Sequence, residues 1–92
     1  MKKQLVFYCF LADWCNGSRI VKPIIKDECS QLKQSYKLID VDTEQGANLS
    51  VKYGIKNVPA IVAVNQYGEV VDVAKGNDCY KIIAKYAKKK WR

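Results

Sequence analysis

The chain has no histidine, and its four cysteines stand far apart without a Cys-x-x-Cys pair among them. Histidine and closely spaced cysteines are the usual ligands of zinc, so the composition disfavours a metal site, and we expect no cofactor. No apolar run is long enough to cross a membrane. No internal repeat, linker or low-complexity stretch interrupts the 92 residues, which predicts a single domain over residues 1–92 with a modest core.

The cysteines and the N-terminus both bear on the cellular compartment. Cys9, Cys15, Cys29 and Cys79 could pair into the two disulfides of a small secreted domain. However, 49% of the residues are hydrophobic, which is enough for a core without disulfides, and Cys9 and Cys29 stand in patterns typical of buried thiols. The apolar run after residues 1–3 imitates a secretory signal but ends without a small-residue cleavage site. We therefore expect a reducing, cytoplasmic setting.

The formal net charge is +7 at pH 7, and much of it lies near the C-terminus. The basic residues there are Lys81, Lys85, Lys88, Lys89, Lys90 and Arg92. Lysines in the last turn of a helix interact favourably with the negative end of its dipole, which favours a solvated helix face. An acidic protein partner is the alternative. The interleaved Tyr80, Tyr86 and Trp91 fit the inner face of a helix better than a nucleic-acid surface, so we expect no nucleic-acid binding.

The strongest functional signal is a cysteine between a predicted strand and a predicted helix. Residues 5–11 form a continuous apolar and aromatic run, typical of a buried strand. Asn16 and Gly17 then provide a turn, and apolar residues recur at helical spacing afterwards. Cys15 therefore lies where unpaired backbone N–H groups and the positive end of the helix dipole favour a thiolate. The pattern predicts a nucleophilic cysteine.

The remaining pattern predicts the element order βαβαββα. Strands are predicted over residues 5–11, 36–42, 59–64 and 69–73, the last two joined as a hairpin by a turn at residues 65–68. Helices are predicted over residues 18–34, kinked by Pro23 near the first turn, over residues 47–53, closed by Gly54, and after an N-cap at Asn77 or Asp78. This order gives an α/β fold with a mixed four-stranded sheet and flanking helices.

Several segments in this order resemble the thioredoxin superfamily. Residues 12–19, ADWCNGSR, followed by Pro23, resemble the active-site helix of thioredoxins, and residues 39–42, IDVD, resemble one of their strands. Residues 52–59, KYGIKNVP, resemble the segment with the family's cis-proline, residues 65–71 its hairpin, and Gly76 the glycine before the last helix. The resemblance covers roughly residues 5–90. It implies a compact thioredoxin fold that lacks the additional N-terminal strand and helix of full thioredoxins.

The resemblance also implies roles for individual residues. It implies that Cys15 is the nucleophile of thiol–disulfide exchange, and that Trp14, Val58, Pro59 and Gly76 surround its sulfur as the substrate groove. A cis Val58–Pro59 bond is implied as well, with substrate backbone pairing beside it in the manner of a strand. The expected substrates are disulfide-containing proteins, and we expect the chain to act on them as a monomer.

Two positions depart from the family pattern. Cys9 stands where thioredoxins keep a buried aspartate, and we interpret it as a core thiol, with a backup resolving thiol as the alternative. Ser18 stands where the family has its second cysteine, which gives a monothiol WCxxS site. A serine hydroxyl there can donate a hydrogen bond to the Cys15 thiolate, so we predict that Ser18 and Cys15 are both catalytic residues.

Ser18 admits three interpretations. A native monothiol site attacks a disulfide but needs an external thiol, from glutathione or a thioredoxin-reductase-type donor, to release the product. Alternatively, Ser18 replaces the resolving cysteine of a dithiol thioredoxin by deliberate substitution. The third interpretation is a non-catalytic adaptor that holds an acidic protein with the same groove and the basic C-terminal helix. The sequence favours the first, a cytoplasmic thiol–disulfide oxidoreductase, and leaves the second open.

Overall fold

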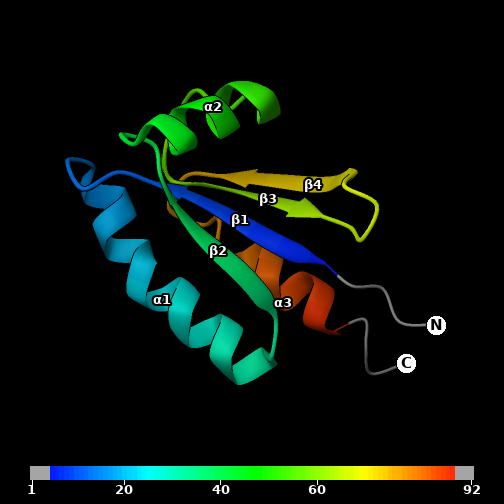
Figure 1. Ribbon diagram of the computed structural model, residues 1–92. Helices are drawn as coiled ribbons and strands as arrows, with labels where there is room; N and C mark the ends of the chain where they lie inside the picture. Colours follow the sequence, from blue (N-terminus) through cyan, green and yellow to red (C-terminus); the bar gives the residue numbers. More distant parts are fainter. Residues whose placement is uncertain (1–4, 89–92) are drawn as a thin grey trace.

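The computed structural model describes residues 5–88, and within them the elements follow the predicted order βαβαββα. The strands are β1 (Val6–Leu11), β2 (Ser35–Asp40), β3 (Ala60–Val64) and β4 (Val70–Lys75). The helices are α1 (Asn16–Leu32), α2 (Glu44–Tyr53) and α3 (Lys81–Lys88). Figure 1 shows these helices around one sheet. The predicted α/β class with a mixed four-stranded sheet is confirmed.

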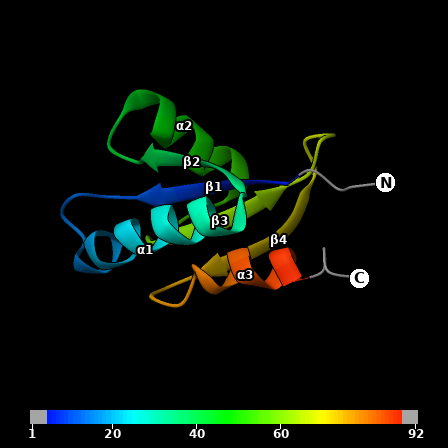
Figure 2. The ribbon, with the colours of Figure 1, turned by 90° about the horizontal axis from the view of Figure 1, so that it is seen from below.

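The strands lie in the order β2-β1-β3-β4. The inner strand β1 is parallel to β2 and antiparallel to β3, and β4 pairs with β3 as the predicted antiparallel hairpin. The parallel pair is joined by α1, as a parallel pair requires a crossover connection. α2 covers one face of the sheet, and α1 and α3 cover the other (Figures 1 and 2).

Apolar side chains fill the space on both faces of the sheet. On the face of α1 and α3 the buried residues are Phe7, Cys9, Leu11, Val21, Ile25, Cys29, Ile61, Ala63, Cys79, Ile82 and Ile83. On the face of α2 they are Phe10, Ile39, Val62 and Val64. Because β1 and β3 contribute to both sets, these two strands are covered on both faces, which explains their continuous apolar sequences.

Helix α1 begins two residues before its predicted start and also ends two residues early. Cys15 has extended backbone angles, φ −100° and ψ 119°, and stands directly before the first helical residue. At the other end Lys33 adopts a left-handed conformation with φ of 55°, which stops the helix. Pro23 lies inside the helix, as predicted, at its eighth residue.

Helix α2 begins three residues before its predicted start because Thr43 caps it. The Thr43 Oγ1 accepts a hydrogen bond from the N–H of Gly46 at 2.9 Å, the usual role of a threonine at this position. The helix ends as predicted at Gly54, which has a left-handed φ of 68°. Gly46 is buried, and a Cβ built on it would overlap the carbonyl oxygen of Asp40. The absence of a side chain at Gly46 thus allows α2 to rest on the end of β2.

The remaining differences concern the segments that join the elements. β2 ends at Asp40 and β3 begins at Ala60, so the predicted strand ends at positions 42 and 59 belong to loops. Helix α3 begins at Lys81, and Asn77 and Asp78 lie in a turn before it, so the predicted N-cap at either of them is wrong. Backbone hydrogen bonds close this turn, among them one from the N–H of Lys81 to the carbonyl of Asp78 at 3.0 Å.

Part of the predicted basic segment lies outside the described residues, namely Lys89, Lys90, Trp91 and Arg92. On α3, Lys81 and Lys85 are exposed, whereas Tyr86 packs against the core, as predicted for an inner helix face. Among the helices described between residues 5 and 88, none has the length and apolar character needed to cross a membrane.

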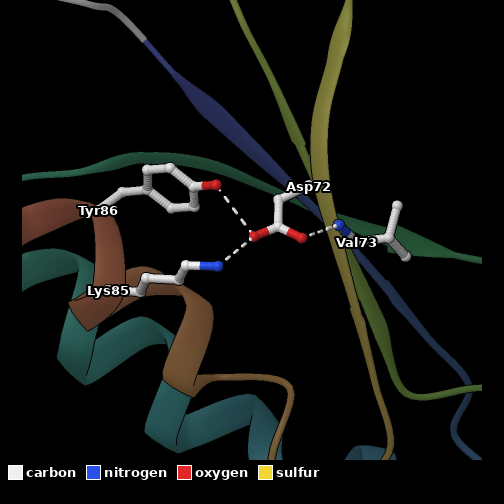
Figure 3. A network of polar contacts seen from close by, with 4 residues as sticks. All are labelled: Asp72, Val73, Lys85 and Tyr86. Atoms are coloured by element: carbon white, nitrogen blue, oxygen red, sulfur yellow. Dashed lines mark hydrogen bonds and ion pairs between the residues drawn. The ribbon is translucent and has the colours of Figure 1, made fainter.

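The carboxylate of Asp72 on the edge strand β4 is hydrogen bonded to two side chains of α3 (Figure 3). Asp72 Oδ2 accepts hydrogen bonds from the Nζ of Lys85 at 2.8 Å and from the hydroxyl of Tyr86 at 2.9 Å. Its Oδ1 accepts a third from the N–H of Val73 at 2.8 Å. These donors, the Lys85 ammonium first, lower the pKa of Asp72 below its ordinary value.

Substitution Gly46→Ala is expected to destabilise the protein by about 1–3 kcal/mol, because the new methyl group forces α2 away from the end of β2. Urea unfolding followed by circular dichroism measures the change. Asn48→Ala, at an exposed position of the same helix, is the control and should stay within about 0.5 kcal/mol of the unchanged protein. Equal stability of the Gly46 and Asn48 variants would contradict the close contact.

Substitution Asp72→Asn is expected to lower the urea midpoint at pH 7. The pKa of Asp72 is lower in the folded than in the unfolded state, so its stabilisation is complete above the unfolded value of about 3.9. That stabilisation is lost as the pH falls through the folded value. The difference between the two proteins should therefore shrink below about pH 4. Asp27→Asn, on the exposed side of α1, is the control, and an equal effect of both substitutions would count against the network.

Candidate active site

Strand directions bring the candidate residues to one edge of the sheet. The carboxyl ends of the parallel strands β1 and β2 lie at this edge, as do the start of β3 and the end of β4, which run antiparallel to each other. Two backbone hydrogen bonds join the loops there. The N–H of Val41 donates to the carbonyl of Leu11 at 3.1 Å, and the N–H of Gly76 donates to the carbonyl of Pro59 at 2.9 Å.

Cys15 lies at this edge, directly before α1, as the sequence predicts. Its side chain is partly exposed, and its thiol donates to the carbonyl of Val58 at 3.5 Å. The loop after β1 is therefore in direct contact with the loop before β3. The sulfur combines access from solvent with a fixed position at the start of a helix, which is the arrangement of a reactive rather than a structural cysteine.

Ser18 is almost completely buried, with 2% of its surface exposed. Its hydroxyl oxygen accepts a hydrogen bond from the backbone N–H of Ala12 at 3.1 Å. A hydroxyl has one hydrogen to donate, and this bond to the oxygen leaves that hydrogen for the sulfur of Cys15. Ser18 thus connects the end of β1 to the thiol, one helical turn from Cys15.

The pKa of Cys15 is lowered below its ordinary value by these neighbours. The backbone N–H of Ser18 contributes most, the Ser18 hydroxyl comes next, and the N–H of Gly17 adds to them, while partial burial opposes the shift. Each donor stabilises the thiolate more than the thiol. The physical cause matches the sequence analysis, because unpaired N–H groups at the start of a helix lie next to the sulfur.

Val58, Pro59 and Gly76 meet beside Cys15. The peptide bond between Val58 and Pro59 is cis. Pro59 is buried, Val58 is half-buried, and Gly76 has a φ of 87°, a conformation that strongly favours glycine. Val58 contacts the predicted nucleophile directly, and Gly76 is joined to the same loop by its hydrogen bond to Pro59.

Trp14 extends from the same loop towards the end of β2. The residue is 69% exposed, and its Nε1 donates to both carboxylate oxygens of Asp42, at 3.0 and 3.3 Å. Trp14 and Val58 line one open hollow of about 340 Å³, together with Val41 and Ile55. Asp42 belongs to the IDVD motif, but its contact with Trp14 could not be predicted, because no local pattern relates two residues that are 28 positions apart.

The other cysteines lie in a different environment. Cys9, Cys29 and Cys79 are free and buried in the core between the sheet and the helices α1 and α3. Burial raises the pKa of Cys29 and that of Cys79 to about 11 each. Burial also raises the pKa of Cys9, and the neighbouring Cys29 and Cys79 raise it further. These thiols stay protonated at neutral pH, and Cys9 is a core residue, as predicted.

No group of three or more histidine, cysteine, aspartate or glutamate side chains is placed to hold a metal ion in the part of the chain from residue 5 to residue 88. At this end of the sheet, N–H and O–H donors lie next to the Cys15 sulfur.

Comparisons with known sequences agree with this geometry. The sequence matches the Thioredoxin family over residues 1–89. The thioredoxin of Pyropia yezoensis is 28% identical over 67 residues, which are 73% of this chain and 62% of that protein. The thioredoxin of Bacillus subtilis is 24% identical over 67 residues, which are 73% of this chain and 64% of that protein. The chain thus spans less than two thirds of the length of these curated relatives.

Solved structures show the same fold. A reduced thioredoxin pre-protein of Schistosoma mansoni has a TM-score of 0.79 and 27% identity, over 96% of this chain and 80% of that chain. The thioredoxin of Fasciola hepatica has a TM-score of 0.81 and 24% identity, over 96% of this chain and 82% of that chain. With the family match over nearly all residues, these findings establish that the fold is the thioredoxin fold and that the chain belongs to the thioredoxin family.

Proposed function

We propose that the chain is a thiol–disulfide oxidoreductase whose nucleophile is the sulfur of Cys15. One observation carries this proposal: Cys15 is partly exposed while N–H and O–H donors from Ser18 and Gly17 lower its pKa. A thiolate, and not a thiol, attacks disulfides, so these donors increase the reactive fraction at neutral pH. Family membership supports the same reaction class.

The first step is a displacement at sulfur. The Cys15 thiolate attacks one sulfur of a substrate disulfide, the bond between the two substrate sulfurs breaks, and the departing sulfur leaves with the electron pair as a thiolate that takes up a proton. The product is a mixed disulfide between Cys15 and the substrate. Electrons balance because the substrate gains one thiol for each Cys15 sulfur that is oxidised.

Release of the mixed disulfide requires a second thiolate. Ser18 occupies the position from which a cysteine would attack, and a hydroxyl cannot form a disulfide. Cys9, Cys29 and Cys79 are buried thiols with raised pKa values, which argues against any of them as the resolving group. The proposed mechanism is therefore monothiol, with an external thiol, from glutathione or a thioredoxin-reductase-type donor, that attacks the mixed disulfide and frees Cys15.

The proposed substrates are disulfide-containing proteins, bound by Trp14, Val58, Pro59 and Gly76. The contact between the Cys15 thiol and the Val58 carbonyl supports this groove, since a peptide joined to Cys15 begins beside the backbone of Val58. A peptide there can pair with the chain in the manner of an added strand. The free state of all four cysteines supports a reducing, cytoplasmic setting as part of the proposal.

Substitution Ser18→Ala is expected to raise the pKa of Cys15, because the hydroxyl donor to the thiolate is lost. A smaller fraction of Cys15 is then ionised at pH 7, so alkylation by iodoacetamide should slow and its pH profile should shift upward. Intact-mass analysis against pH measures both.

The variant should also lose about 1–3 kcal/mol of stability, since the N–H of Ala12 is left without its acceptor. Ser30→Ala, exposed on the same helix, should change neither quantity, and an unshifted Ser18→Ala profile would contradict the assigned role.

Substitution Ser18→Cys is expected to convert a monothiol into a dithiol protein. With glutathione disulfide, the unchanged protein should accumulate one stable glutathione adduct on Cys15. The variant should lose that adduct to an internal disulfide with release of glutathione. With reduced glutathione as the electron donor, it should also reduce protein disulfides at least severalfold faster, because the new thiol attacks the mixed disulfide from within. Ser30→Cys is the control, since about 18 Å of helix separates that position from Ser18. Absence of any Cys15 adduct, or equal turnover of the two cysteine variants, would overturn the monothiol mechanism.

A further inference from the structure

The turn after β4 carries a side chain that the proposed mechanism does not use. Asn77 is exposed and directly follows Gly76, whose N–H is hydrogen bonded to the carbonyl of Pro59 at 2.9 Å. In Figures 1 and 2 this turn, between β4 and α3, lies at the end of the sheet where α1 begins. Asn77 therefore stands at the edge of the sheet that also carries Cys15.

The carboxamide of Asn77 lies beside Gly17. A Cβ built on Gly17 would stand 2.6 Å from Oδ1 of Asn77 and 3.1 Å from Cδ of Pro59. The first distance is too short for a real contact, so a side chain at position 17 would displace the carboxamide of Asn77 from this place. The first turn of α1, the proline before β3 and the side chain of Asn77 thus meet at one point.

The carboxamide of Asn77 is chemically suited to a peptide. It offers two N–H donors and one carbonyl acceptor, which match the carbonyl and N–H groups of a peptide bond. Within residues 5–88 it has no hydrogen-bond partner of its own. A peptide joined to Cys15 begins beside Val58, whose carbonyl is 3.5 Å from the Cys15 sulfur. Pro59, the next residue, lies close to Gly17, as Asn77 does.

We propose that Asn77 is a substrate-binding residue that favours peptide disulfides over small disulfides. Its carboxamide donates to and accepts from the backbone of the peptide held at Cys15. This inference rests on the proposed function, because it needs exchange at Cys15. The carboxamide is neutral, so it distinguishes substrates that have a peptide backbone from substrates that lack one, and not acidic from basic peptides.

Two mixed disulfides with the same leaving group test the proposal. One joins 5-thio-2-nitrobenzoate to the cysteine of a neutral pentapeptide, and the other joins it to 2-mercaptoethanol. In each, the Cys15 thiolate forms a bond to the peptide or mercaptoethanol sulfur, and coloured thionitrobenzoate leaves with the electron pair. The measured quantity is the ratio of the two second-order rate constants, from the absorbance of the released anion.

Substitution Asn77→Ala is expected to lower this ratio roughly 3- to 10-fold, the effect of one or two net hydrogen bonds. Asn77→Leu keeps the bulk without the polar atoms and should lower it to a similar extent. Gly17→Ala should lower the ratio in the same direction, because its methyl group displaces the carboxamide. Asn48→Ala, on the exposed face of α2, is the control and should preserve the ratio.

An unchanged ratio in Asn77→Ala would overturn the proposal, and so would a ratio that Asn77→Leu fully restores, because bulk alone would then explain the contact. Failure of the proposed function looks different. In that case the unchanged protein would release thionitrobenzoate from neither substrate faster than its Cys15→Ser variant does. Circular dichroism of every variant separates these outcomes from loss of folding.

Discussion

The burial of β1 between β2 and β3 is the constraint on which the candidate site depends. The side chains of Phe7, Cys9 and Leu11 enter the core under α1 and α3, and Phe10 enters the core under α2. A strand covered on both faces cannot change register without moving apolar side chains out of both cores. The position of its last residue, Leu11, is therefore fixed. The position of Ala12, the first residue of the loop to Cys15, is fixed with it.

The hydroxyl of Ser18 connects the backbone at the end of β1 to the thiol of Cys15. It accepts from the N–H of Ala12 and is one of the donors that lower the pKa of Cys15. Because the group is buried, both of its roles are performed without competition from bulk water. One side chain thus satisfies a backbone donor at the end of β1 and directs its proton towards the sulfur, while its oxygen is unable to close a disulfide. In the proposed function, activation without internal resolution follows from the oxygen that stands at this position in place of a sulfur.

The four cysteines show that surroundings, and not residue type, decide reactivity. Cys29 and Cys79 have pKa values raised to about 11 because burial disfavours the thiolate. Cys15 has a lowered pKa because N–H and O–H donors at the start of α1 favour it. The core thiols remain protonated at neutral pH, so they would not compete with the reaction proposed for Cys15.

Local signals in the sequence determined the element order, the end of α2 at Gly54, and the pair Cys15 and Ser18, because each depends on residues within one or two turns of chain. Element starts were less predictable, because turn residues and capping residues look alike in the sequence: Thr43 caps α2 through a local bond to the N–H of Gly46, and Cys15 itself ends the loop before α1. The tertiary structure alone decided which distant groups meet the sulfur. The carbonyl of Val58 accepts a hydrogen bond from a thiol that is 43 residues away in the sequence. Asn77 lies close to Gly17 only because antiparallel β4 returns to the end of the sheet where β1 ends. Strand pairing sets such contacts through the register of the whole sheet, and no short stretch of sequence contains that register.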